Sequence, residues 1–422
     1  MEKLKAFLVC SSIMIKTCIG SGILLFPILF TQLGILPCTL YIIINGIFSV
    51  IGLTLYILCN DYYNNKKNMS TLAKKISLKL RYFSDFILIS KTFLLVISYL
   101  VLITGIIRNI LRDFKNKNIV FYAFLLVYML IIFNLTNLKQ LNYLKYSSTI
   151  GVFGVLYLII LSFFYFFTKN HEGDYKIIGA SFKEIIMELP FFVFSFTCHQ
   201  TIFNLQNDYK TYSKNFFIAV SSFSIFVVGL FYFSFGFLNM KIFNLSDKNI
   251  FKNYFDLKID SKAFLAGKIA YLFILTFSIP IQLIPCREYL INMIFGTAYC
   301  ENIEYKMENL TENENLENYA KKNKKTAELP FNKKKNSIIR TITAFILIFL
   351  TVFISQLGLE IKTLQIFIGG TSQTIMCFLL PTIYYTMLKM ANKKLKYKIL
   401  SFLNVAFGFL SFTIFIISIA KR

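Results

Sequence analysis

The sequence has no tryptophan and only two histidines, and it holds 21 acidic residues against 45 lysines and arginines. Its long apolar segments contain almost no aspartate or glutamate, and neither an H-x-x-x-H nor a D-x-x-D pattern occurs in them. An enzyme that works inside a membrane would need such acids or a metal cluster. We therefore expect no enzymatic activity and no metal or other cofactor.

Cysteine pairs suited to cross-linking are also missing. The eight cysteines fall mostly within or beside apolar segments and no two share an outer loop, so we predict no structural disulfide and no zinc site. They occupy positions 10, 18, 38, 59, 198, 286, 300 and 377. A cleavable signal peptide is not expected either, because the first apolar run begins by Ala6, contains Lys16 and lacks an A-x-A site.

Apolar residues dominate the composition of the sequence. They make up 56% of the 422 residues, and 48 residues are phenylalanine. They come in blocks of roughly 18 or more, which is long enough to cross a bilayer as helices. The net charge of +24 is spread over short loops between the blocks, as in loops that face the cytoplasm, and does not indicate nucleic-acid binding. We predict an all-α polytopic membrane protein surrounded by the lipid bilayer.

Hydropathy predicts eleven transmembrane helices of about 20 residues each. They are expected near 7–30, 35–59, 84–107, 119–136, 147–168, 186–204, 216–240, 263–285, 338–356, 363–388 and 399–420. With the N-terminus inside, the inner segments carry 27 lysines and arginines and the outer segments 15; Lys16, Lys91 and Lys268 lie within spans. This bias predicts a cytoplasmic N-terminus and a C-terminus on the opposite side.

Residues 301–336 form the one long hydrophilic insertion. A run of glutamates is followed there by a run of lysines, and too few apolar residues are present for the segment to fold alone. We interpret it as a disordered cytoplasmic linker, with a regulatory role as the alternative. No separate soluble domain is predicted.

The first span contains three features that do not suit an ordinary membrane helix: Lys16, the triplet Gly20-Ser21-Gly22, and Pro27. Gly20 and Gly22 are two residues apart, so they do not form a helix-packing motif, which needs a spacing of four. They instead favour local unwinding, because glycine loses the most backbone entropy in a helix. Unwound backbone in a membrane lines protein or a watery cavity, and a broken helix indicates a transporter's binding site.

The sixth span supplies the second signal. It contains Pro190 and His199, the only histidine in a membrane segment, and residues 197–201 all carry polar or soft side chains. Polar groups in a membrane segment are usually functional. The alternative is a structural histidine that is hydrogen-bonded to a neighbouring helix. The first and sixth spans are five apart and antiparallel, as in a five-plus-five inverted repeat. The repeats would cover about 7–168 and 186–388, with an extra helix at 399–420.

Four stretches, in order, resemble the amino acid/auxin permease group of secondary transporters, which includes the sodium-coupled neutral amino acid transporters and the fungal vacuolar amino acid transporters. They are 15–27, similar to K-T-x-x-G-x-G-x-L-x-x-P; 190–207, similar to F-x-F-T-C-H-x-x-x-F-x-x-x-N-E; 278–290, similar to P-x-x-x-x-P-x-R; and 369–384, similar to G-x-x-x-x-x-x-x-F-x-L-P. Each motif is weak alone, and the ordered set is specific. It spans nearly the whole chain outside 301–336.

The resemblance implies a transporter that binds a free amino acid at the breaks in the first and sixth helices. Backbone amides near Ser21 and Gly22 would receive the carboxylate at a half-helix N-terminus, and carbonyls near Cys18 and Phe194 to Phe196 would take the ammonium. The predicted substrate-binding residues are Cys18, Gly20, Ser21, Gly22, Phe194, Ser195, Phe196 and Thr197.

Sodium-coupled members of this group have asparagine four residues before the first glycine, whereas this sequence has Lys16, as the vacuolar and proton-linked branches commonly do. A fixed ammonium would repel or replace sodium, although Lys16 as a snorkelling structural residue is the alternative. Thr276 and Ser278 sit where sodium-binding members place hydroxyls, so sodium coupling, although disfavoured by Lys16, stays an alternative. We expect ion coupling to involve Lys16, His199, Thr276 and Ser278.

Secondary active amino acid transport, proton-linked or sodium-independent, is therefore the predicted function. A sodium-coupled symporter and an amino acid sensor that binds without transporting are the alternatives. The sequence is compatible with either the vacuolar or the plasma membrane.

Overall fold

The computed structural model describes residues 2–63, 68–111, 114–137, 142–168, 176–242, 262–295, 333–388 and 394–421. These residues form helices joined by short connections, and no strand occurs among them. The elements of the first half are α1 (Glu2–Cys18), η1 (Ile23–Leu25), α2 (Phe26–Leu33), α3 (Ile35–Asp61), α4 (Met69–Ile76), α5 (Leu78–Ile110), α6 (Lys117–Thr136) and α7 (Asn142–Thr168).

The second half begins with the short helices α8 (Phe182–Met187), α9 (Leu189–Ser195) and α10 (Thr201–Asp208), which are followed by both long and short ones. These are α11 (Lys214–Ile242), α12 (Lys262–Phe295), α15 (Lys333–Ser355), α16 (Ile361–Ile368), the π-helical turns η3 (Gly369–Gln373) and η4 (Ile375–Leu379), α17 (Leu380–Met387) and α18 (Leu395–Ala420). Most of the predicted linker, 301–332, lies outside the described residues, and residues 333–336 open α15.

Nine helical spans in the described ranges are long and apolar enough to cross a membrane. A tenth results if α1 and residues 23–33 are counted together, since they meet at a bend of 56°. The sixth predicted span is present as α9 and α10, of 7 and 8 residues, which are separated by residues 196–200. The all-helical membrane class and both helix breaks are confirmed, whereas the count of eleven spans stays a prediction.

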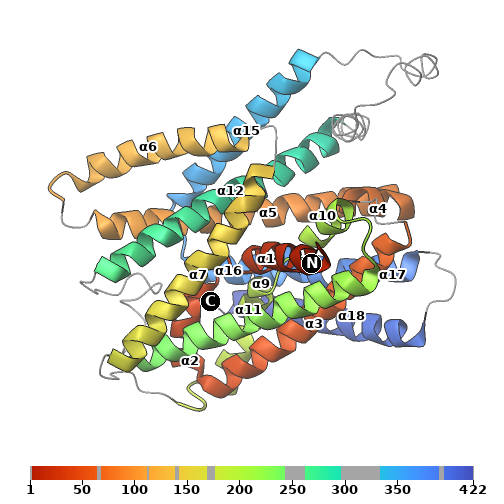
Figure 1. The fold of residues 1–422 in the computed structure, drawn as a ribbon, viewed down its shortest axis with the longest axis horizontal. Coiled ribbons are helices and arrows are strands. Elements are labelled where there is room, and N and C mark those ends of the chain that lie inside the picture. Colours follow the sequence, from red (N-terminus) through yellow and green to blue (C-terminus); the bar gives the residue numbers. More distant parts are fainter. Residues whose placement is uncertain are drawn as a thin grey trace.

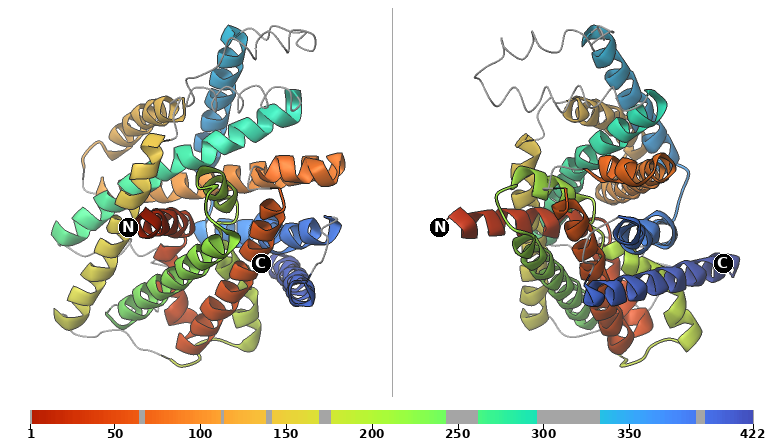
Figure 2. Two further views of the ribbon diagram at one scale, coloured as in Figure 1. Left: turned by 45° about the vertical axis from the view of Figure 1, so that its right-hand side comes forward. Right: turned by 90° about the vertical axis from the view of Figure 1, so that its right-hand side faces the viewer.

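The two broken helices lie inside the bundle. In Figure 1, α1 lies near the middle, and it packs against α7 and α11. Helix α9 packs against α16 and η3, while α5 and α12 form an extensive pair beside them. Both views in Figure 2 keep α6 and α15 at the upper edge, away from α3. Their exposed faces carry large apolar side chains, among them Leu126, Leu130, Phe349 and Phe353, as expected for a surface against lipid.

Polar contacts group the helix ends into two faces. On one face Lys214 Nζ pairs with Asp61 at 3.1 Å, and Arg81 bonds the carbonyl of Asn292 at 3.3 Å. The end of α3 and the starts of α5 and α11 therefore share a face with the end of α12. On the other face Lys362 Nζ pairs with Glu188 at 2.8 Å and bonds Gln32 at 3.2 Å. This grouping agrees with the alternating inner and outer segments read from the sequence.

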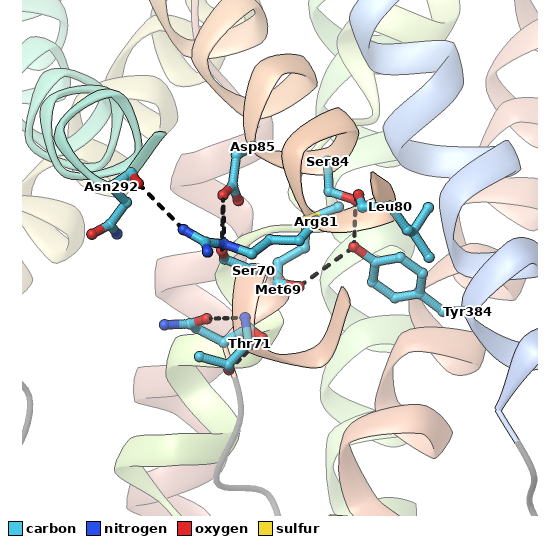
Figure 3. A network of polar contacts seen from close by, with 10 residues as sticks. Met69, Ser70, Thr71, Leu80, Arg81, Ser84, Asp85, Asn292 and Tyr384 are labelled. Carbon is cyan, nitrogen blue, oxygen red and sulfur yellow. Dashed lines mark hydrogen bonds and ion pairs between the residues drawn. The ribbon is translucent and has the colours of Figure 1, made fainter. Parts of the chain in front are cut away.

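A buried polar network on the first of these faces joins four helices (Figure 3). Arg81 Nε lies 3.3 Å from Asp85, and Ser70 of α4 donates to the same carboxylate at 3.0 Å. Tyr384 of α17 donates to Ser84 at 2.7 Å. Arg81 and Asp85 are at most 2% exposed. The network therefore holds α4, α5, α12 and α17 together at one end of the bundle.

Candidate functional site

A small cavity of about 10 Å³, roughly the space that one water molecule needs, lies where the two broken helices meet. Five of the eight predicted substrate-binding residues line it: Cys18, Gly20, Ser21, Phe194 and Thr197. Its other lining residues are Thr17, Leu95, Tyr99 and Gln373. The cavity is smaller than typical ligand pockets of about 300–1,000 Å³, so side chains around it must move before an amino acid can enter.

The glycines of the first break are closely surrounded. A β-carbon on Gly20 would lie 2.6 Å from the hydroxyl of Tyr99 on α5, which is closer than real β-carbons come to other atoms. A β-carbon on Gly22 would lie 3.1 Å from Ser195 Oγ on the other broken helix. Glycine is therefore needed here for close approach between helices as well as for unwinding. Gly22 and Ser195 contact each other beside the cavity without lining it.

Two tyrosines bind the carbonyls that the breaks set free. The hydroxyl of Tyr232 on α11 lies 2.9 Å from the carbonyl oxygen of Cys18 and 2.8 Å from that of Ser195. Tyr271 on α12 donates to the carbonyl of Gly20. Each carbonyl has two lone pairs; that of Cys18 also accepts from the N–H of Gly20 at 2.9 Å, whereas that of Ser195 can accept a second donor. Tyr232 thus joins the carbonyl ends of both half-helices at one point.

The backbone N–H groups after the first break are in a different situation from these carbonyls. In the parts of the chain that the structure describes, the N–H groups of Ser21 and Gly22 have no acceptor. They precede η1 and α2, whose N-terminal end carries partial positive charge. The side chain of Ser21 shares a hydrogen bond of 2.9 Å with Ser98 on α5, and Gln365 of α16 donates to Ser98 at 3.5 Å. Free amides beside a helix N-terminus are suited to bind a carboxylate.

Phe196, the remaining predicted substrate-binding residue, lies outside the cavity lining. Its carbonyl accepts a hydrogen bond of 2.8 Å from Ser49 on α3, and its ring packs edge-on against Tyr232. The residue that follows it, Thr197, does line the cavity, and its hydroxyl donates to the carbonyl of Val193 at 3.0 Å. The second break therefore presents Phe194 and Thr197 to the cavity and turns Phe196 toward α3.

Lys16 lies in the last turn of α1, just before the break, and is 6% exposed. Its methylene carbons pack on Gly151 of α7, where a β-carbon would lie 3.0 Å from Lys16 Cε. Gly151 leaves room for this stem, so the lysine extends between α1 and α7 within the bundle. An ammonium is thereby placed inside the protein, close to the broken backbone.

His199 and Lys91 lie near each other beside the second break. His199 is fully buried, and neither ring nitrogen has a hydrogen-bond partner among the described residues. Its ring lies edge-on to Tyr56 of α3 at 6.2 Å. Lys91 of α5, also fully buried, donates to Gln200 Oε1 at 3.1 Å, and Gln200 in turn donates to Gln282 of α12 at 3.0 Å. This chain of side chains links α5 and α12 to the start of α10.

The two predicted hydroxyl residues of the eighth span do not meet the cavity. Thr276 accepts a hydrogen bond of 3.0 Å from Tyr128 of α6 and donates to the carbonyl of Leu272. Ser278 donates to the carbonyl of Ile274 at 2.7 Å. The structure thus brings together the residues of the two breaks and directs the side chain of Thr276 toward α6.

Several residues of the site were not singled out in the sequence: Ser98, Tyr99, Tyr232, Tyr271, Gln373 and Lys91. A tyrosine in mid-membrane needs a partner for its hydroxyl, but 25 tyrosines give that signal no selectivity. The spacing of Lys91, Leu95 and Tyr99 was a usable signal, because residues four apart share a helix face. It would have shown that one face of α5 combines a buried charge with the cavity wall.

The sequence profile described as transmembrane amino acid transporter protein matches residues 7–421. The chain belongs to this family. Vacuolar amino acid transporter 5 of Saccharomyces cerevisiae is 25% identical to it over 401 residues, covering 88% of this chain and 86% of that protein. Vacuolar amino acid transporter 5 of Schizosaccharomyces pombe is 26% identical over 290 residues, covering 65% of this chain and 66% of that one. The resemblance to the amino acid permease group is thus confirmed. The protein is a transporter, not an enzyme.

Solved transporter structures share the fold of this amino acid transporter family member. A manganese transporter of Eremococcus coleocola superposes with a TM-score of 0.55 at 13% identity, over 99% of this chain and 86% of that one. A transporter of the nucleobase-cation-symport-1 family superposes with a TM-score of 0.53 at 11% identity, over 98% of this chain and 91% of that one. These two structures resemble this chain in the arrangement of their helices.

Proposed function

We propose that this family member carries a free amino acid by alternating access, with the substrate bound across the two helix breaks. The amides of Ser21 and Gly22 receive its carboxylate, because they have no acceptor among the described residues and precede a helix N-terminus. Its ammonium is bound near the carbonyls of Cys18 and Ser195, which Tyr232 joins, and the carbonyl of Ser195 has a lone pair left to accept it. The cavity opens when Phe194 and Tyr99 move apart.

Transport is independent of sodium, and this part of the proposal rests on the position of Lys16. Its buried ammonium stands one turn before the break, in the region where a coupling cation would need oxygen ligands. Two unit charges 4 Å apart repel by about 4 kcal/mol at an effective dielectric of 20, so a sodium ion is disfavoured there. The direction of the Thr276 hydroxyl, toward Tyr128 on α6, fits the same conclusion.

Proton coupling is assigned to Lys16 beside the first break, with His199 at the second break as a proton-responsive group in the gate. The His199 ring is fully buried and closely enclosed by α3, where a β-carbon on Gly52 would lie 2.9 Å from its Nε2. Any change in the charge of this ring would displace α3 or the break itself. The vacuolar relatives favour a vacuolar membrane, and the excess of lysine and arginine in the inner segments favours an N-terminus in the cytoplasm.

Uptake by proteoliposomes under imposed gradients tests this function. We expect accumulation of labelled amino acid that follows an imposed pH gradient and is unchanged when choline replaces sodium. Lys16→Asn should reduce the dependence on the pH gradient at least severalfold, because the fixed charge is lost.

Three results would contradict the proposal in different ways. Uptake that follows the sodium gradient and ignores pH would make the protein a sodium symporter. Binding of amino acid without accumulation would make it a sensor. A Lys16→Asn protein with an unchanged pH response would remove Lys16 from coupling.

A further inference from the structure

Gln373 presents a buried amide to the cavity without a partner for its oxygen. The side chain is 1% exposed and lines the cavity together with Leu95, Tyr99 and Thr197. Its Oε1 has no hydrogen-bond partner among the described residues. Because buried polar atoms in native proteins are nearly always hydrogen-bonded, each exception calls for a reason.

The backbone around Gln373 is built to hold this side chain in place. Gln373 ends the five-residue π-helical turn η3, a rare geometry that is frequent at functional sites. At the start of that turn Gly369 is pressed against α9, since a β-carbon there would overlap the carbonyl of Pro190. After it, Thr374 donates to the carbonyl of Gly369 at 2.7 Å and bonds Ser411 of α18 at 3.2 Å.

Another glutamine of the same span, Gln365, also has a side-chain oxygen without a partner among the described residues, but its amide nitrogen is hydrogen-bonded. Gln365 Nε2 donates to Ser98, which bonds Ser21, so this amide supports the first break from outside the cavity. Gln373, eight residues further on, is the amide of this span that lines the cavity. The two glutamines therefore differ in what they touch, although they are chemically identical.

The chemistry of the lining defines what Gln373 can recognise. A primary amide offers one acceptor oxygen and two N–H donors, so it matches a ligand that carries a hydroxyl or an amide. None of the nine lining side chains is charged, and a charged group buried without a partner is strongly unfavourable. Uncharged side chains that form hydrogen bonds fit both conditions.

We propose that Gln373 is a specificity residue that bonds the side chain of the substrate and selects amino acids whose side chains are uncharged and hydrogen-bonding. This inference rests on the proposed function, because it places the substrate in the same cavity. It goes further in naming the substrate class and the residue that distinguishes its members from apolar amino acids of similar size.

Competition between matched amino acids in proteoliposomes tests the inference. The pairs are threonine with valine, asparagine with leucine, and glutamine with methionine, each similar in size and different in polarity. We expect the native protein to prefer the polar member by about tenfold or more, since a site that hydrogen-bonds a substrate rejects an analogue without the group. Gln373→Met should bring the ratio to one or below, and Gln373→Asn should keep part of the preference.

Gln365→Met is the matched control, because it removes an amide from the same span outside the cavity. We expect it to lower uptake of both members of each pair by the same factor and to leave their ratio unchanged. If Gln373→Met also lowers both members equally, Gln373 acts on the shared part of the substrate or on the fold, and the inference is wrong. A native ratio near one would also overturn it, whereas no uptake of any amino acid would refute the proposed function itself.

Discussion

At the scale of single residues, the site depends on glycines, which have no side chain, as much as on residues with functional side chains. Gly20 faces the Tyr99 hydroxyl, Gly22 faces Ser195, and Gly151 faces the stem of Lys16. A methyl group would collide with a residue from another helix at Gly20, and at Gly22 and Gly151 it would press tightly against one. These glycines therefore set how closely α1 approaches α5, α7 and α9.

Gly20→Ala should reduce transport at least tenfold, because its β-carbon would lie 2.6 Å from Tyr99 Oη. The added atom also opposes the unwound backbone of the break. Initial rates of amino acid uptake, corrected for the amount of protein in the liposomes, measure the effect.

Gly105→Ala is the matched control, because a β-carbon at Gly105 on α5 would meet nothing within 4 Å. It should leave transport within about twofold and stabilise the helix slightly, by roughly 0.5–1 kcal/mol. Adding Tyr99→Phe to Gly20→Ala removes the colliding oxygen and should restore part of the activity. If the double variant is no better than the single one, backbone conformation and not the collision explains the loss.

The sequence predicted half of this site for a physical reason. Gly20, Ser21 and Lys16 are unusual within an apolar helix, so their chemistry is visible without knowledge of the fold. Tyr99, Tyr232 and Gln373 are ordinary residues that acquire a role only because α5, α11 and η3 bring them to the breaks. Such roles follow from tertiary packing, which local composition does not encode.

At the scale of helices, α5 and α12 are longer than a bilayer requires. Their 33 and 34 residues correspond to about 50 Å at 1.5 Å per residue, against a hydrocarbon core of about 30 Å. The start of α5 can therefore extend past the lipid tails, and there it carries Arg81 and Asp85 (Figure 3). A buried ion pair is more favourable at this depth than at the middle of the membrane.

Arg81→Met should destabilise the protein by about 3–5 kcal/mol, because it leaves the carboxylate of Asp85 buried without its charge partner. Adding Asp85→Leu should recover much of that loss, since no lone charge then remains. Denaturant unfolding in detergent, followed by tryptophan-independent probes such as circular dichroism, measures the change in free energy.

Lys214→Met is the comparison variant for this prediction. It breaks the ion pair with Asp61, in which the two side chains are 48% and 30% exposed. Exposed pairs contribute about 0–1 kcal/mol, so this variant should unfold nearly as the native protein does. Equal losses in Arg81→Met and Lys214→Met would mean that burial of the network has no energetic importance.

The helix breaks were predictable because glycine and proline change backbone preference locally. The π-helical turns η3 and η4 were not, although Gly369 and Gly370 were part of a quoted motif. A π-turn differs from an α-turn by one residue, and here it is maintained by the contacts of Gly369 with Pro190 and of Gly370 with Phe415. Nothing within the span itself distinguishes the two forms.

At the scale of the whole molecule, the helix ends divide into two polar faces that the lipid-facing surface separates. Arg340 of α15 pairs with Glu288 of α12 at 2.9 Å, so both helices that flank the 301–336 segment meet on the face that holds Arg81. That is the face predicted to be cytoplasmic from its excess of lysine and arginine.

Engineered protease sites test this arrangement. A site inserted within 301–336 and a second within 64–67 should both be cut in inside-out vesicles and protected in sealed right-side-out vesicles. A site after Ala420 should show the opposite behaviour. Cleavage of the 301–336 site from outside sealed cells would reverse the predicted orientation.

The π-helical turns within residues 369–379 also limit where this chain can change in length during evolution. A π-turn holds one residue more than an α-turn, so losing one residue there can convert it to ordinary helix and leave the later side chains of the span on the same faces. Losing a residue in the regular helix that follows would instead turn every later side chain by about 100°, and Tyr384 would then leave the buried network. Descendants of this sequence can gain or lose residues in their loops, but within this span only at the π-turns.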